Sequence, residues 1–168
     1  MRSKIGYFSL GGIILVVLVL GVYRFSYAPT DNLSTPSADS KIEVEKYLTR
    51  LYVVTSDTDR EIGLSKFSSL QPEEGMLFVF DSNNFWKIWM KDMKFSIDII
   101  FLDQNFRVIG LHENISPESY PATYSSVTPS RYVLETNAGF ITERGIKVGQ
   151  TVIFDQKTVY NSTKKEVN

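Results

Sequence analysis

Two carboxylates stand inside segments that otherwise have the composition of buried β-strands. Asp98 lies within the apolar run Ile97–Leu102, and Glu135 lies within Tyr-Val-Leu-Glu-Thr. A buried charge without a partner is costly, so each carboxylate needs one, and Lys91 is available for a structural ion pair. The alternative is catalytic: Asp98 and Glu135 would serve as general acid and base in the cleavage of an envelope glycan, with one pKa raised by burial. Of the two, the structural pair is the commoner arrangement.

Trp89 occupies an unusual position for a large aromatic residue. Side chains alternate between the two faces of a regular strand, so Trp89 shares a face with Lys87 and Lys91, whereas Trp86 and Met90 take the other. An aromatic ring flanked by lysines suits a sugar or peptide ligand that stacks on it. The alternative, favoured by the many apolar neighbours, is an indole that closes the edge of the core beneath the lysine stems.

The segment from Ser116 to Ser130 is rich in proline, serine, threonine and tyrosine. A loop of about 15 residues without secondary structure is uncommon in a compact domain unless it carries function. Its two tyrosines combine apolar area with a polar tip, so the loop is a candidate cover for a pocket. We predict a ligand site in one concave region beside this loop. The side chains expected to converge there are Trp89, Lys91, Asp98 and Glu135, and the loop adds Tyr120 and Tyr124.

Methionine and histidine provide the soft-metal option in a chain that has no cysteine. Met76, Met90 and His112 offer thioether and imidazole ligands for cuprous ion. They lack the close spacing of a copper motif, and methionine more often fills space in a core, so we predict no metal and no cofactor. The absence of cysteine also excludes a disulfide framework, a thiolate zinc site and a cysteine nucleophile.

The composition fits one globular domain that does not bind nucleic acid. Of the 168 residues, 43% are hydrophobic and 13% are aromatic, which is enough for one well-filled core. The 18 basic and 19 acidic residues give a formal net charge of -1. Nucleic-acid binding would call for a clustered basic face, which this balance disfavours.

The N-terminal segment is long enough to cross a bilayer. Ile5 to Tyr23 is a run of 19 residues without a charge, and about 20 apolar residues span the hydrocarbon core as a helix. Arg2 and Lys4 precede this run, so the excess of positive charge places the N-terminus in the cytoplasm. We predict a cytoplasmic end (1–4), a transmembrane signal anchor (5–23), a polar linker (24–41) and an external domain.

A cleaved signal peptide is the alternative, because Ser26-Tyr27-Ala28 places small residues three apart. The apolar run is longer than a usual signal core, and Pro29 would directly follow the cut. Both features favour an uncleaved anchor.

Apolar and β-branched runs predict a mainly β domain over residues 42–156, followed by a polar tail over 157–168. The densest stretch, Gly75 to Leu102, contains three expected strands and forms the predicted core. Its first and third runs are apolar on both faces, which indicates a sheet covered on both sides, as in a sandwich or barrel-like fold. The expected strands are Leu51–Thr55, Met76–Phe80, Trp86–Met90, Ile97–Leu102, Phe106–Leu111, Arg131–Thr136 and Thr151–Phe154.

Two short helices are expected between these strands. Ser56 to Asp59 has the S-x-x-D pattern of a helix start, and the helix continues through Ile62 to Phe67. The second helix covers Asn137 to Arg144 and ends before Gly145, which suits the left-handed position after a helix. Asp103-Gln104-Asn105 is expected to join two of the strands as a hairpin.

Six sequence pieces follow one another in a fixed order: Arg60-Glu61-Ile62-Gly63-Leu64, Gly75-Met76-Leu77-Phe78-Val79-Phe80, Trp89-Met90-Lys91, Asp98-Ile99-Ile100-Phe101-Leu102-Asp103, Tyr132-Val133-Leu134-Glu135 with Ala138-Gly139, and Gly145-Ile146-Lys147-Val148-Gly149. Together they resemble the family called domain of unknown function 192. The resemblance covers roughly residues 47–154 and implies a compact, mostly β domain that is often exported or membrane-anchored, with no established activity. Three departures from the usual family residues are Ser65, Asp92-Met93 and Gln150.

These observations predict a single-pass protein of the cell membrane whose C-terminal domain lies outside the cytoplasm. We interpret the domain as a non-enzymatic module that binds a ligand or has a structural role in the envelope, because no catalytic motif in the chain is specific. The expected partners are the membrane and an envelope glycan or peptide. The two alternatives are the glycan hydrolase and the copper-binding protein described above.

Protease added to intact spheroplasts is expected to digest the domain that follows residue 41, because the charge bias around residues 5–23 places that domain outside. An immunoblot against the domain measures its loss, and a cytoplasmic protein that stays intact controls for lysis. Protection of the domain until the membrane is broken would contradict this orientation.

Overall fold

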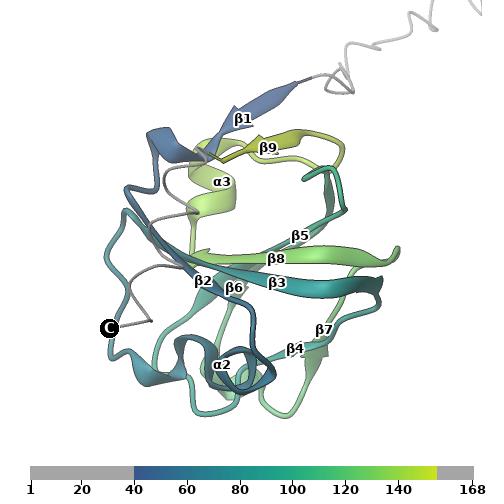
Figure 1. Cartoon of the computed structure of the whole chain (residues 1–168). Coiled ribbons are helices and arrows are strands. Elements are labelled where there is room, and N and C mark those ends of the chain that lie inside the picture. Colours follow the sequence, from purple (N-terminus) through teal and green to yellow (C-terminus); the bar gives the residue numbers. More distant parts are fainter. Residues whose placement is uncertain (1–39, 155–168) are drawn as a thin grey trace, which may run out of the picture. The chain divides into compact units, whose positions relative to one another are not determined.

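The computed structural model describes residues 40–154, and its centre is a five-stranded sheet (Figure 1). The strand order is β2-β3-β8-β5-β6. Strands β2 and β3 run parallel, whereas the other neighbouring pairs are antiparallel. The bounds are β2 (Arg50–Val54), β3 (Glu74–Asn84), β5 (Ile97–Leu102), β6 (Val108–Ile115) and β8 (Ser130–Asn137).

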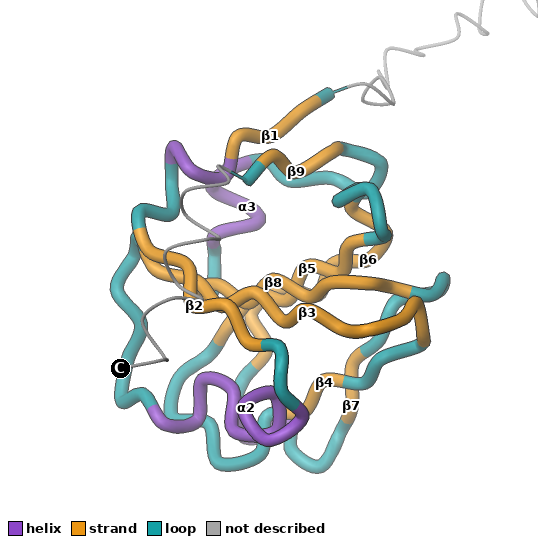
Figure 2. Tube along the Cα trace, in the orientation of Figure 1, coloured by secondary structure: helices purple, strands orange, loops and turns teal. Residues whose placement is uncertain are grey.

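Each face of this sheet is covered by a different set of small elements (Figure 1, Figure 2). One face carries α3 (Phe140–Arg144) and a parallel pair formed by β1 (Lys41–Glu43) and β9 (Thr151–Ile153). The other face carries α2 (Asp57–Ile62) and an antiparallel pair formed by β4 (Ile88–Trp89) and β7 (Thr123–Tyr124). Three 3-10 helices complete the described elements: η1 (Val44–Lys46), η2 (Gly63–Lys66) and η3 (Pro117–Ser119).

Alternate residues of the central strands enter two separate hydrophobic cores. On β5, Ile100 and Leu102 pack toward α3 and β9, whereas Ile99 and Phe101 pack toward the side of α2 and β4. All six residues of β5 are buried. The two cores explain why this strand has no polar face, because a sheet covered on both sides buries both sets of side chains.

The prediction of a mainly β domain with two short helices is confirmed. The described residues form an open five-stranded sheet with two small additional sheets, and they form no closed barrel. The bounds expected for β5 match the structure, whereas the other expected strands differ from it at one or both ends. The strand expected over Trp86–Met90 shrinks to the two residues of β4.

The hairpin between β5 and β6 is confirmed, but its second strand begins later than predicted. The Asp103 carboxylate accepts hydrogen bonds from the backbone N–H of Asn105 (2.7 Å) and of Arg107 (2.9 Å). Phe106 adopts a positive φ of 58° and therefore belongs to the turn, not to β6. An aromatic residue in this conformation is uncommon, so the apolar run that begins at Phe106 was misleading.

The helix start predicted at Ser56 is confirmed. The Ser56 side chain accepts a hydrogen bond from the N–H of Asp59, as an N-cap does. The α-helix ends at Ile62, because Gly63 turns the chain with a φ of 49°, and the segment that follows is the 3-10 helix η2. The second helix starts at Phe140 instead of Asn137, because Asn137 still belongs to β8.

The segment 116–130 was expected to lack secondary structure, and this prediction is wrong. It contains the 3-10 helix η3 and the strand β7. Strand β7 pairs with β4, so that Thr123 lies opposite Trp89 and Tyr124 lies opposite Ile88. The segment is therefore tied to the same short strand that carries Trp89.

The predicted anchor (5–23), the cytoplasmic end and the polar tail (157–168) lie outside the described residues, as does the linker apart from its last two positions. Lys41, at the end of that linker, begins β1. Within residues 40–154, no helix has the length and apolar character needed to span a bilayer. The membrane topology stays a prediction.

Replacing Gly63 by alanine is expected to lower the free energy of unfolding by more than the same change at Gly145. Both glycines have a positive φ. Gly145, with a ψ of 36°, is in the left-handed region, which costs a residue with a Cβ roughly 1–2 kcal/mol, whereas Gly63, with a ψ of -137°, has a conformation that glycine alone adopts readily. A Cβ on Gly63 would also lie 3.3 Å from the Phe78 ring, whereas one on Gly145 would meet no atom within 4 Å. Urea denaturation of both variants measures the difference, and equal losses would show that the contact with Phe78 is unimportant.

Candidate functional site

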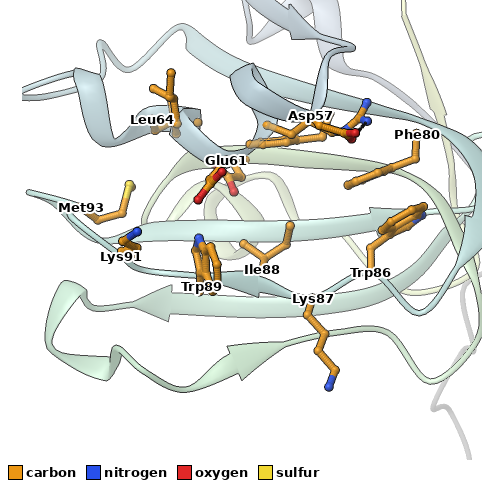
Figure 3. A pocket seen from close by; sticks show the side chains of 15 residues that line it. Asp57, Glu61, Leu64, Phe80, Trp86, Lys87, Ile88, Trp89, Lys91 and Met93 are labelled. Carbon is orange, nitrogen blue, oxygen red and sulfur yellow. Dashed lines mark hydrogen bonds and ion pairs between the residues drawn. The ribbon is translucent and has the colours of Figure 1, made fainter.

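A pocket of about 210 Å³ opens between α2 and the segment that contains β4 (Figure 3). Helix α2 contributes Asp57, Arg60 and Glu61 to it, and the central strands contribute Phe78, Phe80 and Glu135. The remaining lining residues come from positions 62–64, where α2 ends and η2 begins, and from residues 86–93, among them Trp86, Ile88, Trp89 and Lys91. The pocket combines aromatic walls with acidic and basic groups.

Glu135 is the buried polar group of this pocket. It lies on β8 between Met76 of β3 and Ile99 of β5, and only 4% of its surface is exposed. Within residues 40–154 its carboxyl group has no hydrogen-bond or ion-pair partner. Burial raises the pKa of Glu135 to about 8, because the charged form loses its hydration without gaining a partner. The carboxyl group is therefore mostly protonated at pH 7.

Trp89 and Lys91 lie together at one wall of the pocket. Ile88 and Met90 are buried, whereas Trp89 is 43% exposed, so the predicted alternation along this segment is confirmed. The Lys91 ammonium lies 5.8 Å from the centroid of the Trp89 ring, within the range of a cation–π contact. The ion pair expected between Lys91 and a buried carboxylate is absent from the described residues.

Asp98 faces away from this pocket. It lies opposite Thr136 in the β5–β8 register, one position along from the pair Ile99–Glu135, so its side chain points to the other face of the sheet. There the carboxylate accepts hydrogen bonds from the N–H of Asn114 and from the N–H of Ile141, each at 2.8 Å. Asp98 is fully buried, and it holds the first turn of α3 against β5 and β6.

This placement corrects two predictions. The four side chains expected to converge do not all do so, because Trp89, Lys91 and Glu135 line the pocket and Asp98 does not. The catalytic pair of Asp98 and Glu135 is also wrong, because a glycosidase requires both carboxyl groups in one cleft and these two lie on opposite faces of a sheet.

Neither of the two tyrosines of segment 116–130 lines the pocket. Tyr124 is opposite Ile88 in the β4–β7 pair, and its ring packs against His112 with the centroids 5.2 Å apart. Tyr120 is 48% exposed. The segment therefore adjoins Trp89 through backbone pairing, and ligand contacts by the tyrosines stay a prediction.

The candidate copper ligands are engaged in packing and hydrogen bonding. Met76 and Met90 are each 1% exposed and pack in the core on the α2 side of the sheet. His112 lies on β6, where its Nε2 atom is 2.9 Å from the carbonyl oxygen of Ser125 and its ring contacts Phe101. Both methionines have the packing role that methionine commonly takes in proteins.

Arg60, like Glu61, is a residue of the site that the sequence reasoning did not single out. Its guanidinium pairs with Asp57, donates to the carbonyl oxygens of Thr55 and Val79 (2.7 Å for Val79), and lies 5.0 Å from the centroid of the Phe80 ring. Phe80 in turn stacks on Trp86. Arg60 therefore fastens α2 to β3 and holds one wall of the pocket in place. The i, i+3 spacing of Asp57 and Arg60 was the signal that could have indicated this pair.

Comparison with known proteins identifies the family. The sequence model of domain of unknown function 192 (DUF192, uncharacterized ACR) matches residues 40–154, which is more than half of the chain. The chain belongs to this family. The match covers the whole described domain, so the resemblance seen in the six sequence pieces is confirmed. No functionally curated protein matches the chain.

Two solved structures are similar to the domain. One is described as a "putative transcription regulator" from Sinorhizobium meliloti 1021, with 32% sequence identity, a TM-score of 0.57, and coverage of 59% of this chain and 76% of that one. The other is a protein of unknown function from Novosphingobium aromaticivorans DSM 12444, with 28% identity, a TM-score of 0.56, and coverage of 59% of this chain and 70% of that one.

Four of the DUF192-like sequence pieces meet at the pocket although they are distant in the chain. They are the piece at 60–64 with Arg60 and Glu61, the piece at 75–80 with Phe78 and Phe80, the piece at 89–91 with Trp89 and Lys91, and the piece at 132–135 with Glu135. Helix, short strand and central strand thus bring their distinctive residues to one place. This convergence makes the pocket the candidate functional site of the domain.

Replacing Glu135 by glutamine is expected to flatten the pH dependence of stability. The unfolded glutamate titrates near its usual pKa of 4.5 and the folded one near 8, so between these values the folded state holds one proton more than the unfolded state. Stability of the natural protein therefore falls as pH rises from about 5 to 8, by up to roughly 1.4 kcal/mol per pH unit. The fall ends above pH 8, where both states are ionised.

Urea denaturation at pH 5, 6, 7 and 8 measures this slope for the natural protein and for the Glu135→Gln variant. Glu143→Gln, at an exposed position on α3, is the matched control and should keep the natural slope. An unchanged slope in Glu135→Gln would show that Glu135 is already ionised at neutral pH.

Proposed function

We propose that the domain is a non-enzymatic module that binds a small polar ligand in the pocket between α2 and β4. The observation that carries the proposal is the buried Glu135 carboxyl, which borders the pocket and has no partner within residues 40–154. Buried polar groups in folded proteins are nearly always hydrogen-bonded, and those that are not call for an explanation. A ligand that forms hydrogen bonds with the Glu135 carboxyl group would explain why this group has no partner in the protein.

The size and lining of the pocket define what it can hold. Pockets for drug-sized ligands measure roughly 300–1,000 Å³, so a volume of about 210 Å³ suits a smaller group, such as one sugar ring or the end of a peptide. Trp89 offers a partly exposed aromatic face on which such a group can stack. Both groups belong to the glycan and peptide partners expected from the sequence.

We also propose that residues 5–23 anchor the module to the cell membrane with the domain outside the cytoplasm. The length of the uncharged run and the two preceding basic residues support this location. In this position the module would meet components of the cell envelope. The proteolysis of spheroplasts described above tests the location independently of any ligand.

Replacing Trp89 by alanine is expected to weaken ligand binding at least tenfold while lowering stability by less than about 1.5 kcal/mol. The tryptophan is 43% exposed, so its removal leaves no full cavity in the core. The adjacent Met90→Ala is the matched control: it removes a side chain that is 1% exposed and should cost about 2–5 kcal/mol of stability.

Binding is measured by NMR titration of the Trp indole N–H signals with a panel of monosaccharides and dipeptides, and stability by urea denaturation. A loss of stability in Trp89→Ala as large as that in Met90→Ala would make Trp89 a core residue. Failure of every member of the panel to shift the indole signals would remove the binding function.

A further inference from the structure

Some of the charged side chains around the pocket have hydrogen-bond or ion-pair partners, and others do not. Arg60 pairs with Asp57 and donates to two backbone carbonyl groups, so its charge already has a counter-ion and three of its five N–H donors are in use. Lys87 extends away from the pocket in Figure 3. Glu61, in contrast, reaches from α2 toward the pocket in Figure 3, and within residues 40–154 its carboxylate has no hydrogen-bond or ion-pair partner. Two carboxyl groups of the pocket lining, those of the exposed Glu61 and the buried Glu135, therefore have no partner within residues 40–154, and the ammonium of Lys91 is contacted by the Trp89 ring.

The aromatic wall is suited to the opposite charge. The Trp89 ring already lies beside a cation, because the ammonium of Lys91 is 5.8 Å from its centroid. The negative face of an indole attracts a ligand cation in the same way. A group with positive charge that entered the pocket would therefore have an aromatic face on one side and two acidic side chains available as acceptors.

We propose that the ligand of this pocket carries a primary ammonium group, which donates hydrogen bonds to Glu135 and Glu61 while the rest of the ligand packs against Trp89. This inference rests on the proposed binding function and names the chemistry of the ligand. An ammonium has three N–H donors, enough to serve both carboxyl groups at once. Charge-assisted hydrogen bonds of this kind are stronger than those of a neutral hydroxyl.

Two small molecules could bring the same group: an amino sugar or a peptide with a free N-terminus. Both pair the ammonium with a small body that can lie on an indole face. The chemistry at Glu135 is identical for the two sources, so their comparison belongs to the experiment.

Binding of an ammonium ligand should release a proton, whereas binding of a neutral ligand should not. At pH 6.5, before binding, the buried Glu135 carboxyl group is protonated and the ligand amine is an ammonium. In the complex the ammonium stabilises the carboxylate form of Glu135, so the carboxyl group gives up its proton to the solvent. The other charged groups that line the pocket are Asp57, Arg60 and Glu61 from α2, and Lys91 from the segment after β4; Lys87 also belongs to the lining, but its ammonium points away in Figure 3. Binding should therefore release close to one proton.

The experiment is isothermal titration calorimetry of the full chain in detergent at pH 6.5, in two buffers with different ionisation enthalpies. The probes form two matched pairs: glucosamine with glucose, and alanyl-alanine with its N-acetylated form. We expect one amine to bind with release of about one proton, and its neutral counterpart to bind at least tenfold more weakly. The pair that responds identifies the source of the ammonium.

Two variants assign the effect to the pocket. Glu135→Gln should abolish the proton release and weaken binding of the amine at least tenfold. Glu143→Gln, an exposed acid on α3, should behave like the natural protein. Proton release that persists in Glu135→Gln would overturn the inference, because the proton would then come from another group.

The failure of this inference can be distinguished from failure of the proposed function. Equal binding of an amine and its neutral counterpart without proton release would overturn the ammonium assignment and leave the pocket as a site for neutral ligands. Binding of neither amine would also overturn it, and the wider NMR panel would then decide whether the pocket binds any ligand.

Discussion

The whole domain depends on a central sheet that is buried on both of its faces. Strands β5 and β8 supply side chains to two cores at once, and every residue of β5 is inaccessible to water. A polar side chain on such strands has to find a partner within the protein or border a cavity, because hydration is not available. The fold meets this constraint in two different ways, on neighbouring positions of one strand pair.

Asp98 and Glu135 are the two cases. The carboxylate of Asp98 accepts hydrogen bonds from two backbone N–H groups, and so it can remain buried without a ligand. Glu135 has no such donors, holds its proton with a pKa of about 8, and lies beside a pocket with aromatic walls. The carboxyl group of Asp98 thus has a structural role on one face of the sheet, whereas that of Glu135 is available to a ligand on the other face. Perturbed carboxyl groups of the second kind are typical of functional sites.

The sequence predicted local features well and long-range ones poorly. Ser56 marked the start of α2, and the alternation around Trp89 correctly placed that side chain on the exposed face. The opposed directions of Asp98 and Glu135 could not be predicted, because they depend on the β5–β8 register, which pairs residues 30 to 40 positions apart in the chain. Strand β7 was missed for a different reason: two paired residues in a proline-rich segment leave no pattern to detect.

The hydrogen bond from the N–H of Ile141 to Asp98 has a consequence for the site on the other face. Helix α3 follows β8 after only two residues, so a carboxylate that holds the helix also fixes where β8 stops along β5. A slip of β8 by a single residue would turn Glu135 toward α3 and place Leu134 or Thr136 beside the pocket, since side-chain direction alternates with every position. Asp98 therefore holds β8 in register with β5. It touches no part of the pocket, yet it influences which side chain of β8 the pocket contains.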